Sequence, residues 1–114
     1  MRGLAIIVAS FLIWAHVSLA PAEIKVELDL RPTTLEGVVR DIIERLSAED
    51  RALVKSRRKE ELIKFHHGWG TGIRNRYGLW ESNSKLVQAA CGKPCHPDEA
   101  SMIIIEAVWQ ALQK

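Results

Sequence analysis

Residues 33–46, TTLEGVVRDIIERL, carry the clearest folding signal in the chain. Apolar side chains recur there every three or four positions, and charged side chains fill the positions between them, as on an amphipathic helix. Thr33 and Glu36 fit a capping box, in which the hydroxyl and the carboxylate accept hydrogen bonds from free amides of the first turn. The stretch therefore predicts a helix with one buried face.

Helical patterns continue toward the C-terminus. Ser47 suits the start of a second helix, and the charged run that follows predicts a break near Ser56. Pro97 suits the first turn of a last helix, whose apolar residues recur at helical spacing up to Leu112. We therefore expect an all-α fold, a small bundle of about four or five helices formed by residues 35–114.

Four glycines lie between these helices in the sequence. Gly68, Gly70 and Gly72 alternate with other residues, and their spacing does not fit a phosphate-binding loop. Glycine also lets a helix backbone pack very close to another element, and we expect this use here. Gly78 is expected to end a helix.

The first 22 residues have the layout of a secretory signal peptide, with a basic start, an apolar stretch and small residues in that order. Cleavage is expected after Ala22, so that the mature chain begins at Glu23. The apolar stretch is shorter than the roughly 20 residues of a membrane span, so no stable span is expected after cleavage. We expect an exported protein, periplasmic or secreted.

Residues 23–34 are expected to form an N-terminal arm. Ile24, Val26, Leu28 and Leu30 alternate with charged residues, a pattern typical of a strand with one buried face. A lone strand has nothing to pair with inside the chain, because no other segment alternates in this way. The segment is a strand paired with a partner chain, an extended arm, or a lead-in to the first helix.

Composition limits the class of protein further. The 114 residues allow one domain, and 16 basic and 14 acidic residues give a formal net charge of +2. That balance argues against nucleic acid as the main partner. Two cysteines are too few for a dense disulfide framework. In an oxidising compartment we expect Cys91 and Cys95 to form one disulfide, with the bend supplied by Gly92 and Pro94.

Several short sequence blocks in the second half of the chain occur in the same order as in one protein family. They are Glu60-Glu61-Leu62-Ile63, Phe65-His66 with Gly68 and Gly70, Ile73-Arg74-Asn75, Gly78-Leu79-Trp80, and His96-Pro97-Asp98-Glu99 with Ser101. Together they resemble a bacterial domain family of unknown function with a Phe-His-x-Gly-x-Gly, Ile-Arg-Asn, Gly-Leu-Trp and His-Pro-Asp-Asp/Glu signature. The resemblance covers roughly residues 35–110 and implies a mostly helical domain, without an activity.

The polar members of these blocks define a candidate binding site. In the functional interpretation they converge in one apolar cleft walled by two tryptophans. The candidate residues are His66, Trp69, Arg74, Asn75, Trp80, His96, Asp98 and Ser101. A structural alternative, in which these groups hydrogen-bond helix ends or cap the last helix, is favoured when one sequence is the only evidence.

The expected function is a non-enzymatic protein or peptide interaction module of the cell envelope. One alternative is a small envelope enzyme that uses His66 and Asp98, with Ser101 as nucleophile. Another is a metal or redox module that uses Cys91, Cys95 and His96. We assign no catalytic residue, no metal site and no cofactor from the sequence.

Overall fold

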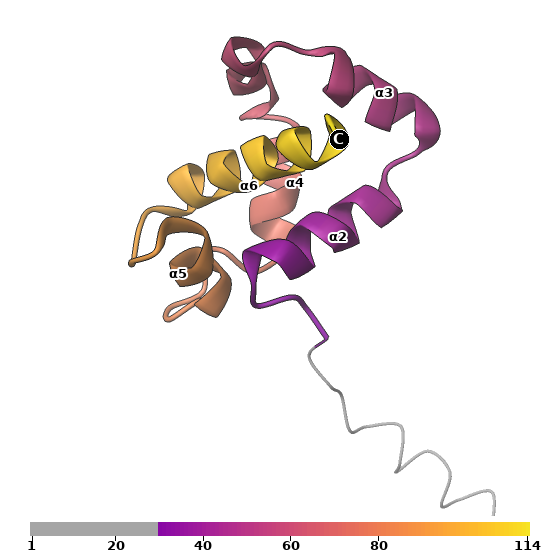
Figure 1. Cartoon of the computed structure of the whole chain (residues 1–114). Coiled ribbons are helices and arrows are strands. Elements are labelled where there is room, and N and C mark those ends of the chain that lie inside the picture. Colours follow the sequence, from indigo (N-terminus) through magenta and orange to yellow (C-terminus); the bar gives the residue numbers. More distant parts are fainter. Residues whose placement is uncertain (1–29) are drawn as a thin grey trace, which may run out of the picture. The chain divides into compact units, whose positions relative to one another are not determined.

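The computed structural model describes residues 30–114, which form six helices and no strand (Figure 1). In chain order they are α2 (Leu35–Arg45), α3 (Ala48–Ser56), the 3-10 helix η1 (Lys59–Phe65), α4 (Trp69–Arg76), α5 (Lys85–Cys91) and α6 (Pro97–Leu112). The all-α prediction is confirmed, with one helix more than the upper predicted number. The predicted signal peptide and residues 23–29 of the predicted arm lie outside the described residues.

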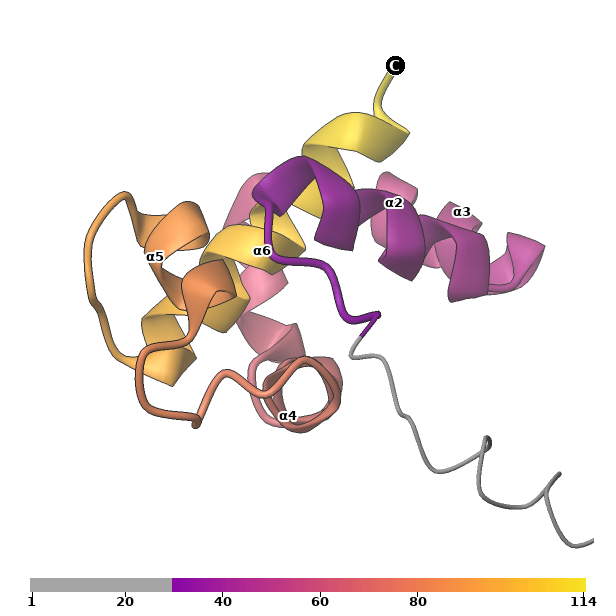
Figure 2. The same ribbon diagram turned by 90° about the horizontal axis from the view of Figure 1, so that it is seen from below.

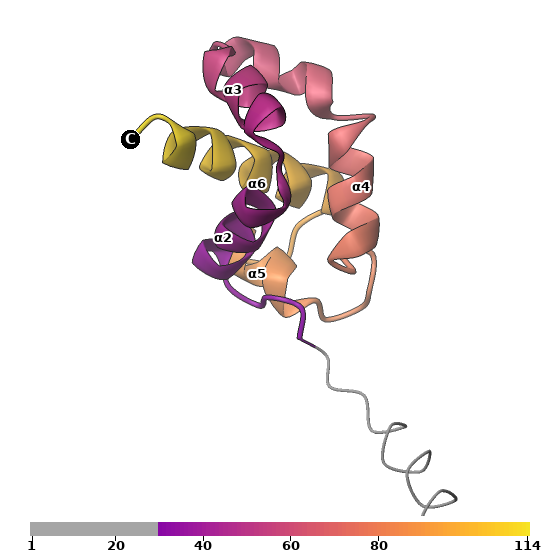
Figure 3. The same cartoon turned by 90° about the vertical axis from the view of Figure 1, so that its right-hand side faces the viewer.

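The longest helix, α6, is the one on which all the others pack. In Figure 3, α3 lies on one side of α6, and α2 and α5 lie on the other. Figure 2 shows α5 and α3 toward opposite ends of α6. Ala100, Ile104, Ile105 and Val108 of this helix are fully buried, because they recur at helical spacing on one face. The core of the domain is therefore built around α6.

Local capping explains where most of the helices begin. Ser47 and Ser84 cap α3 and α5, and their hydroxyls accept hydrogen bonds from amides of the first turn. Pro97 stands at the first position of α6, as predicted. The predicted break after α3 also occurs, since this helix ends at Ser56.

The predicted start of α2 is wrong by one residue. The N-cap is Thr34 rather than Thr33, and its hydroxyl accepts a hydrogen bond from the Gly37 amide at 3.0 Å. A side chain on Gly37 would crowd this hydroxyl, because its Cβ would lie 2.9 Å from the Thr34 oxygen. Glu36 is consequently one position too early to complete a capping box.

The turn after α4 contains the glycine that was expected to end a helix. Gly78 follows the last turn of α4 with φ +65°, a left-handed conformation that glycine adopts without strain. A Cβ at this position would overlap the ion pair between Arg31 and Glu81. Gly78 thus ends α4 and leaves room for that ion pair.

None of the helices in residues 30–114 combines the length and the apolar character that crossing a membrane requires.

Candidate functional site

The centre of the predicted polar site is Arg74 of α4, whose side chain is buried against α6. One terminal nitrogen donates to the Ser101 hydroxyl at 2.9 Å. The other donates to the Thr71 hydroxyl at 2.9 Å and to the His66 carbonyl at 3.2 Å. The Nε atom lies 3.4 Å from a carboxylate oxygen of Asp98. The buried guanidinium is therefore hydrogen-bonded through both terminal nitrogens and ion-paired through Nε, as a buried charge needs to be.

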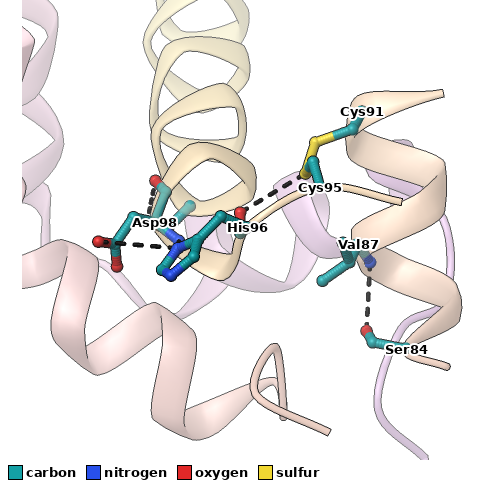
Figure 4. The surroundings of a disulfide bond; sticks show 7 residues. Ser84, Val87, Cys91, Cys95, His96 and Asp98 are labelled. Carbon is teal, nitrogen blue, oxygen red and sulfur yellow. Dashed lines mark hydrogen bonds and ion pairs between the residues drawn. A yellow bond between two sulfur atoms is a disulfide. The ribbon is translucent and has the colours of Figure 1, made fainter. Parts of the chain in front are cut away.

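The start of α6 supplies two of the partners of Arg74, Ser101 and Asp98. Ser101 is fully buried, and its hydroxyl donates to the Asp98 carbonyl at 2.9 Å. The Asp98 amide donates in turn to Nδ1 of His96, the N-cap of α6, at 3.0 Å. Figure 4 shows His96 and Asp98 together at this helix start, next to the cysteine pair. The polar groups thus serve the start of α6 and its contact with α4.

Gly70 lets Arg74 reach this position. A Cβ on Gly70 would stand 3.0 Å from an Arg74 nitrogen and 3.3 Å from the Phe65 carbonyl oxygen. The predicted close packing of glycine is confirmed here. It is wrong for Gly68 and Gly72, where a Cβ would meet nothing within 4 Å.

His66 contacts the same cluster more loosely. Its Nε2 lies 3.9 Å from a carboxylate oxygen of Asp98. Its Nδ1 is buried and has no hydrogen-bond partner among the described residues. The His67 ring packs edge-on against it, with centroids 4.9 Å apart. His66 and Asp98, the two residues of the enzyme hypothesis, are therefore close to each other. The Ser101 hydroxyl, the nucleophile of that hypothesis, is fully buried and not accessible to a substrate.

The structure brings five of the eight candidate residues together: His66, Arg74, His96, Asp98 and Ser101. Trp80 touches the edge of this group, with its ring 5.6 Å from that of His96, and is 58% exposed.

Trp69 and Asn75 lie apart from this cluster. Asn75 is exposed on α4, and Trp69 packs edge-on against Phe65. The expectation of one cleft walled by Trp69 and Trp80 is wrong, because the two side chains line different pockets. Residues five apart on a helix point about 140° apart, so Trp69 and Arg74 face different neighbours.

Trp69 lines a pocket between α2 and α4, which we call the α2–α4 pocket. It has a volume of about 360 Å³. Its lining residues are Ile42, Arg45, Leu46, Trp69, Gly72, Ile73, Arg76 and Tyr77. The lining is apolar and aromatic, and its two charged members are both arginines. Arg45, Arg76 and Tyr77 were not predicted as site residues, because only the packing of α2 against α4 brings them together.

Next to this pocket, a hydrogen bond joins the C-cap residue of α4, Tyr77, to α2. The Tyr77 hydroxyl donates to a carboxylate oxygen of Asp41 at 2.6 Å, and Arg45 Nε donates to the same oxygen at 3.0 Å. The Tyr77 hydrogen bond, then that of Arg45, holds the pKa of Asp41 below its usual range. Burial, then the bond to Asp41, raises the pKa of Tyr77 to about 12. The link therefore joins a neutral phenol to an ionised carboxylate at ordinary pH.

Two further pockets on the described residues have a different lining. One, of about 210 Å³, is lined by Trp80, Pro94, Cys95 and neighbours. The other, of about 290 Å³, lies between η1 and α6 and includes three glutamates and one lysine in its lining. Its lysine, Lys59, is paired with Glu106 at 2.9 Å.

Cys91 and Cys95 are at disulfide distance, with their sulfurs 1.94 Å apart (Figure 4). Within residues 30–114, no group of three or more histidine, cysteine, aspartate or glutamate side chains is arranged to hold a metal ion. His96, the third member of the metal hypothesis, uses Nδ1 to cap α6.

The fold and this polar cluster define a small all-α domain. A family model covers residues 31–112. The chain belongs to that family, a domain of unknown function (DUF6794). No curated protein and no solved structure matches the chain.

Proposed function

We propose that the protein is an exported, non-enzymatic interaction module of the cell envelope, which binds a peptide segment of a partner protein in the α2–α4 pocket. The observation that carries this proposal is the pocket itself. Its volume of about 360 Å³ falls within the range of ligand sites, and an apolar lining with a few polar groups is typical of them. Tryptophan, tyrosine and arginine, which all line it, are the residue types most often found at binding hot spots.

The lining also includes one of the predicted site residues, Trp69. Trp69, Gly72, Ile73 and Arg76 all come from the stretch that contains Gly-Trp-Gly and Ile-Arg-Asn. Arg74 of the same stretch is buried and supports the pocket from the other side of α4. A helix fixed in this way gives a preformed site, and a preformed site loses less entropy on binding.

Export is supported by two features of the chain. Residues 1–22 have the order of charge, apolar stretch and small residues that a signal peptide has. Cys91 and Cys95 stand at disulfide distance, and disulfides persist in oxidising compartments. Cell fractionation and mass measurement test this part, with an exported chain that begins at Glu23 as the expected result.

Binding is tested by cross-linking capture with a pocket-filling variant. Gly72→Leu adds a side chain to the lining of the pocket, and its Cβ meets nothing within 4 Å. Gly68→Leu is the matched control, since a Cβ on Gly68 also meets nothing and this residue does not line the pocket. We expect one stoichiometric partner to be recovered with the unchanged chain and with Gly68→Leu, and lost with Gly72→Leu. Equal recovery by both variants, or no partner, contradicts the proposal.

A further inference from the structure

We infer that the α2–α4 pocket recognises the C-terminal residue of its partner, with an apolar side chain inside the pocket and the terminal carboxylate at Arg45 and Arg76. This inference rests on the proposed function, because it names the part of the partner that the same pocket would bind.

The charge of the pocket points to an anion. Arg45 and Arg76 are its only charged lining residues among those described. By contrast, the pocket between η1 and α6 includes three glutamates in its lining, and its lysine is already paired with one of them. Of the three pockets described on residues 30–114, the α2–α4 pocket is therefore the one whose charge is complementary to a carboxylate.

The two arginines retain capacity for such a partner. Arg76 forms no salt bridge within residues 30–114, and its guanidinium stands 5.9 Å from the centre of the Tyr77 ring. Arg45 binds Asp41 through Nε at 3.0 Å, and this is its only salt bridge to a described residue. The terminal nitrogens of Arg45 remain for a second carboxylate, and paired N–H groups of arginine match carboxylate geometry.

The Asp41 carboxylate reduces the positive charge at this site without cancelling it. It lies next to the pocket, where Tyr77 and Arg45 bind it, and does not line the pocket. Two guanidinium groups and one carboxylate leave an excess of one positive charge at the pocket rim.

The geometry of peptides favours a chain end over an internal acidic residue. In an extended peptide, neighbouring side chains point to opposite faces, so an acidic residue next to an apolar one points away from the pocket that receives its neighbour. At a C-terminus the carboxylate and the apolar side chain share one Cα. Both can then reach a pocket with an apolar interior and a basic rim, as in other modes of C-terminal recognition.

The interior has the shape and chemistry for a large apolar side chain. Trp69 and Tyr77 supply aromatic surface, and Ile42, Leu46 and Ile73 supply aliphatic surface. Gly72 leaves open space where any other residue would place a Cβ. We therefore expect leucine or phenylalanine at the partner's C-terminus to bind more tightly than alanine.

Fluorescence anisotropy with short peptides tests this inference directly on the protein as recovered from cells. The probes are dye-labelled Gly-Ser-Gly-Ser-Leu, Gly-Ser-Gly-Ser-Phe and Gly-Ser-Gly-Ser-Ala, each with a free C-terminal carboxylate and again with a C-terminal amide. We expect the leucine or phenylalanine acid to bind, and its amide to bind at least about 10-fold more weakly. Arg76→Gln should cause a similar loss, whereas Arg40→Gln, an exposed arginine of α2 outside the pocket, should not.

Several results overturn the inference. These are equal binding of the acid and the amide, unchanged binding by Arg76→Gln, or no binding of any free-acid peptide. If the capture experiment still shows a partner that Gly72→Leu loses, any of these results leaves the proposed function standing and removes only the C-terminal recognition. If capture shows no dependence on the pocket, both proposals fail.

Discussion

Two glycines of α4, Gly70 and Gly72, are separated by a single residue but have opposite surroundings. Gly70 faces the buried Arg74 and a backbone carbonyl, whereas Gly72 faces the open α2–α4 pocket. The same residue type therefore has two roles in one helix: close packing at Gly70, and open space at Gly72.

Replacing each glycine by alanine should separate these roles. Gly72→Ala should raise the free energy of unfolding by about 0.5–1 kcal/mol, since alanine is the better helix former and its Cβ meets no atom. Gly70→Ala should lower it by about 1 kcal/mol or more, because the Phe65 carbonyl and Arg74 would have to move. Urea denaturation measures both values. A stabilising Gly70→Ala would show that Arg74 adjusts without cost.

Arg74 should be among the most sensitive positions of the domain. Arg74→Met keeps much of the volume but removes the donors to Ser101, Thr71 and the His66 carbonyl. We expect the free energy of unfolding to fall by about 2–4 kcal/mol, because buried acceptors lose their partners. Arg76→Met on the exposed side should change it by less than about 0.5 kcal/mol. Similar small values for both variants would argue against a structural role of Arg74.

At the scale of elements, α2 and α4 are joined by a bond whose strength depends on pH. The chain contains a single tyrosine, so the near-ultraviolet absorbance of tyrosinate reports the ionisation of Tyr77 alone. Titration of the folded protein should give a midpoint at about 12, where a free tyrosine ionises at about 10. A midpoint near 10 would show that Tyr77 is neither buried nor bound to Asp41.

Because of the shifted pKa values of Tyr77 and Asp41, the free energy of unfolding should depend on pH in both the alkaline and the acidic range. The raised pKa of Tyr77 adds stability that is fully present below about pH 10 and is lost as pH rises through about 12. The lowered pKa of Asp41 adds stability that is present above about pH 4 and is lost as pH falls through the folded value. Tyr77→Phe should remove the alkaline loss, as urea denaturation at pH 9 and above would show.

The disulfide loop between α5 and α6 should contribute a modest amount. Closing a ring of five residues stabilises by about 2 kcal/mol on the chain-entropy model. Reduction should therefore lower the melting temperature without unfolding the domain, as calorimetry with and without reductant would show. The double variant Cys91→Ser, Cys95→Ser is the control and should melt at one temperature in both buffers. Unchanged melting together with two titratable thiols would exclude the bond.

Helix starts were predictable because their signals are local. Ser47 and Pro97 act within one turn, so a single sequence shows them. The one-residue error at Thr33 arose because two adjacent threonines carry the same signal. Which of the two threonines caps the helix depends on Gly37, because a side chain at that position would crowd the Thr34 hydroxyl.

The site was less predictable because its contacts span long sequence distances. Arg74 and Ser101 are 27 residues apart, and Tyr77 and Asp41 are 36 apart. The motif blocks correctly grouped five candidate residues, yet no spacing shows that Arg74 is buried while Trp69 turns toward α2. Arg45 was missed for the same reason, since the sequence of α2 gives no sign that it lines a pocket together with α4.

At the scale of the whole molecule, α6 connects every other helix. Each of them packs on α6, and its inner face is completely buried. This arrangement leaves no subset of helices with a core of its own. We therefore expect residues 31–114 to unfold in one cooperative step.

A cavity in α6 should test this cooperativity. Ile104→Ala removes a fully buried side chain and should cost about 2–5 kcal/mol. Far-ultraviolet circular dichroism and tryptophan fluorescence should still give coincident transitions. Ile63→Ala, on an exposed side chain, should cost less than about 0.5 kcal/mol. Separate transitions for the two signals would show that part of the domain folds without α6.

The position of α6 as the last helix of this domain in chain order sets when the domain can fold during synthesis. The helices that precede it have at most 11 residues each, and such short helices are marginal in water without a packing partner. A nascent chain lacks that partner until α6 has left the ribosome. The five preceding helices should therefore stay open until α6 emerges, and a translocation channel could thread them up to that point.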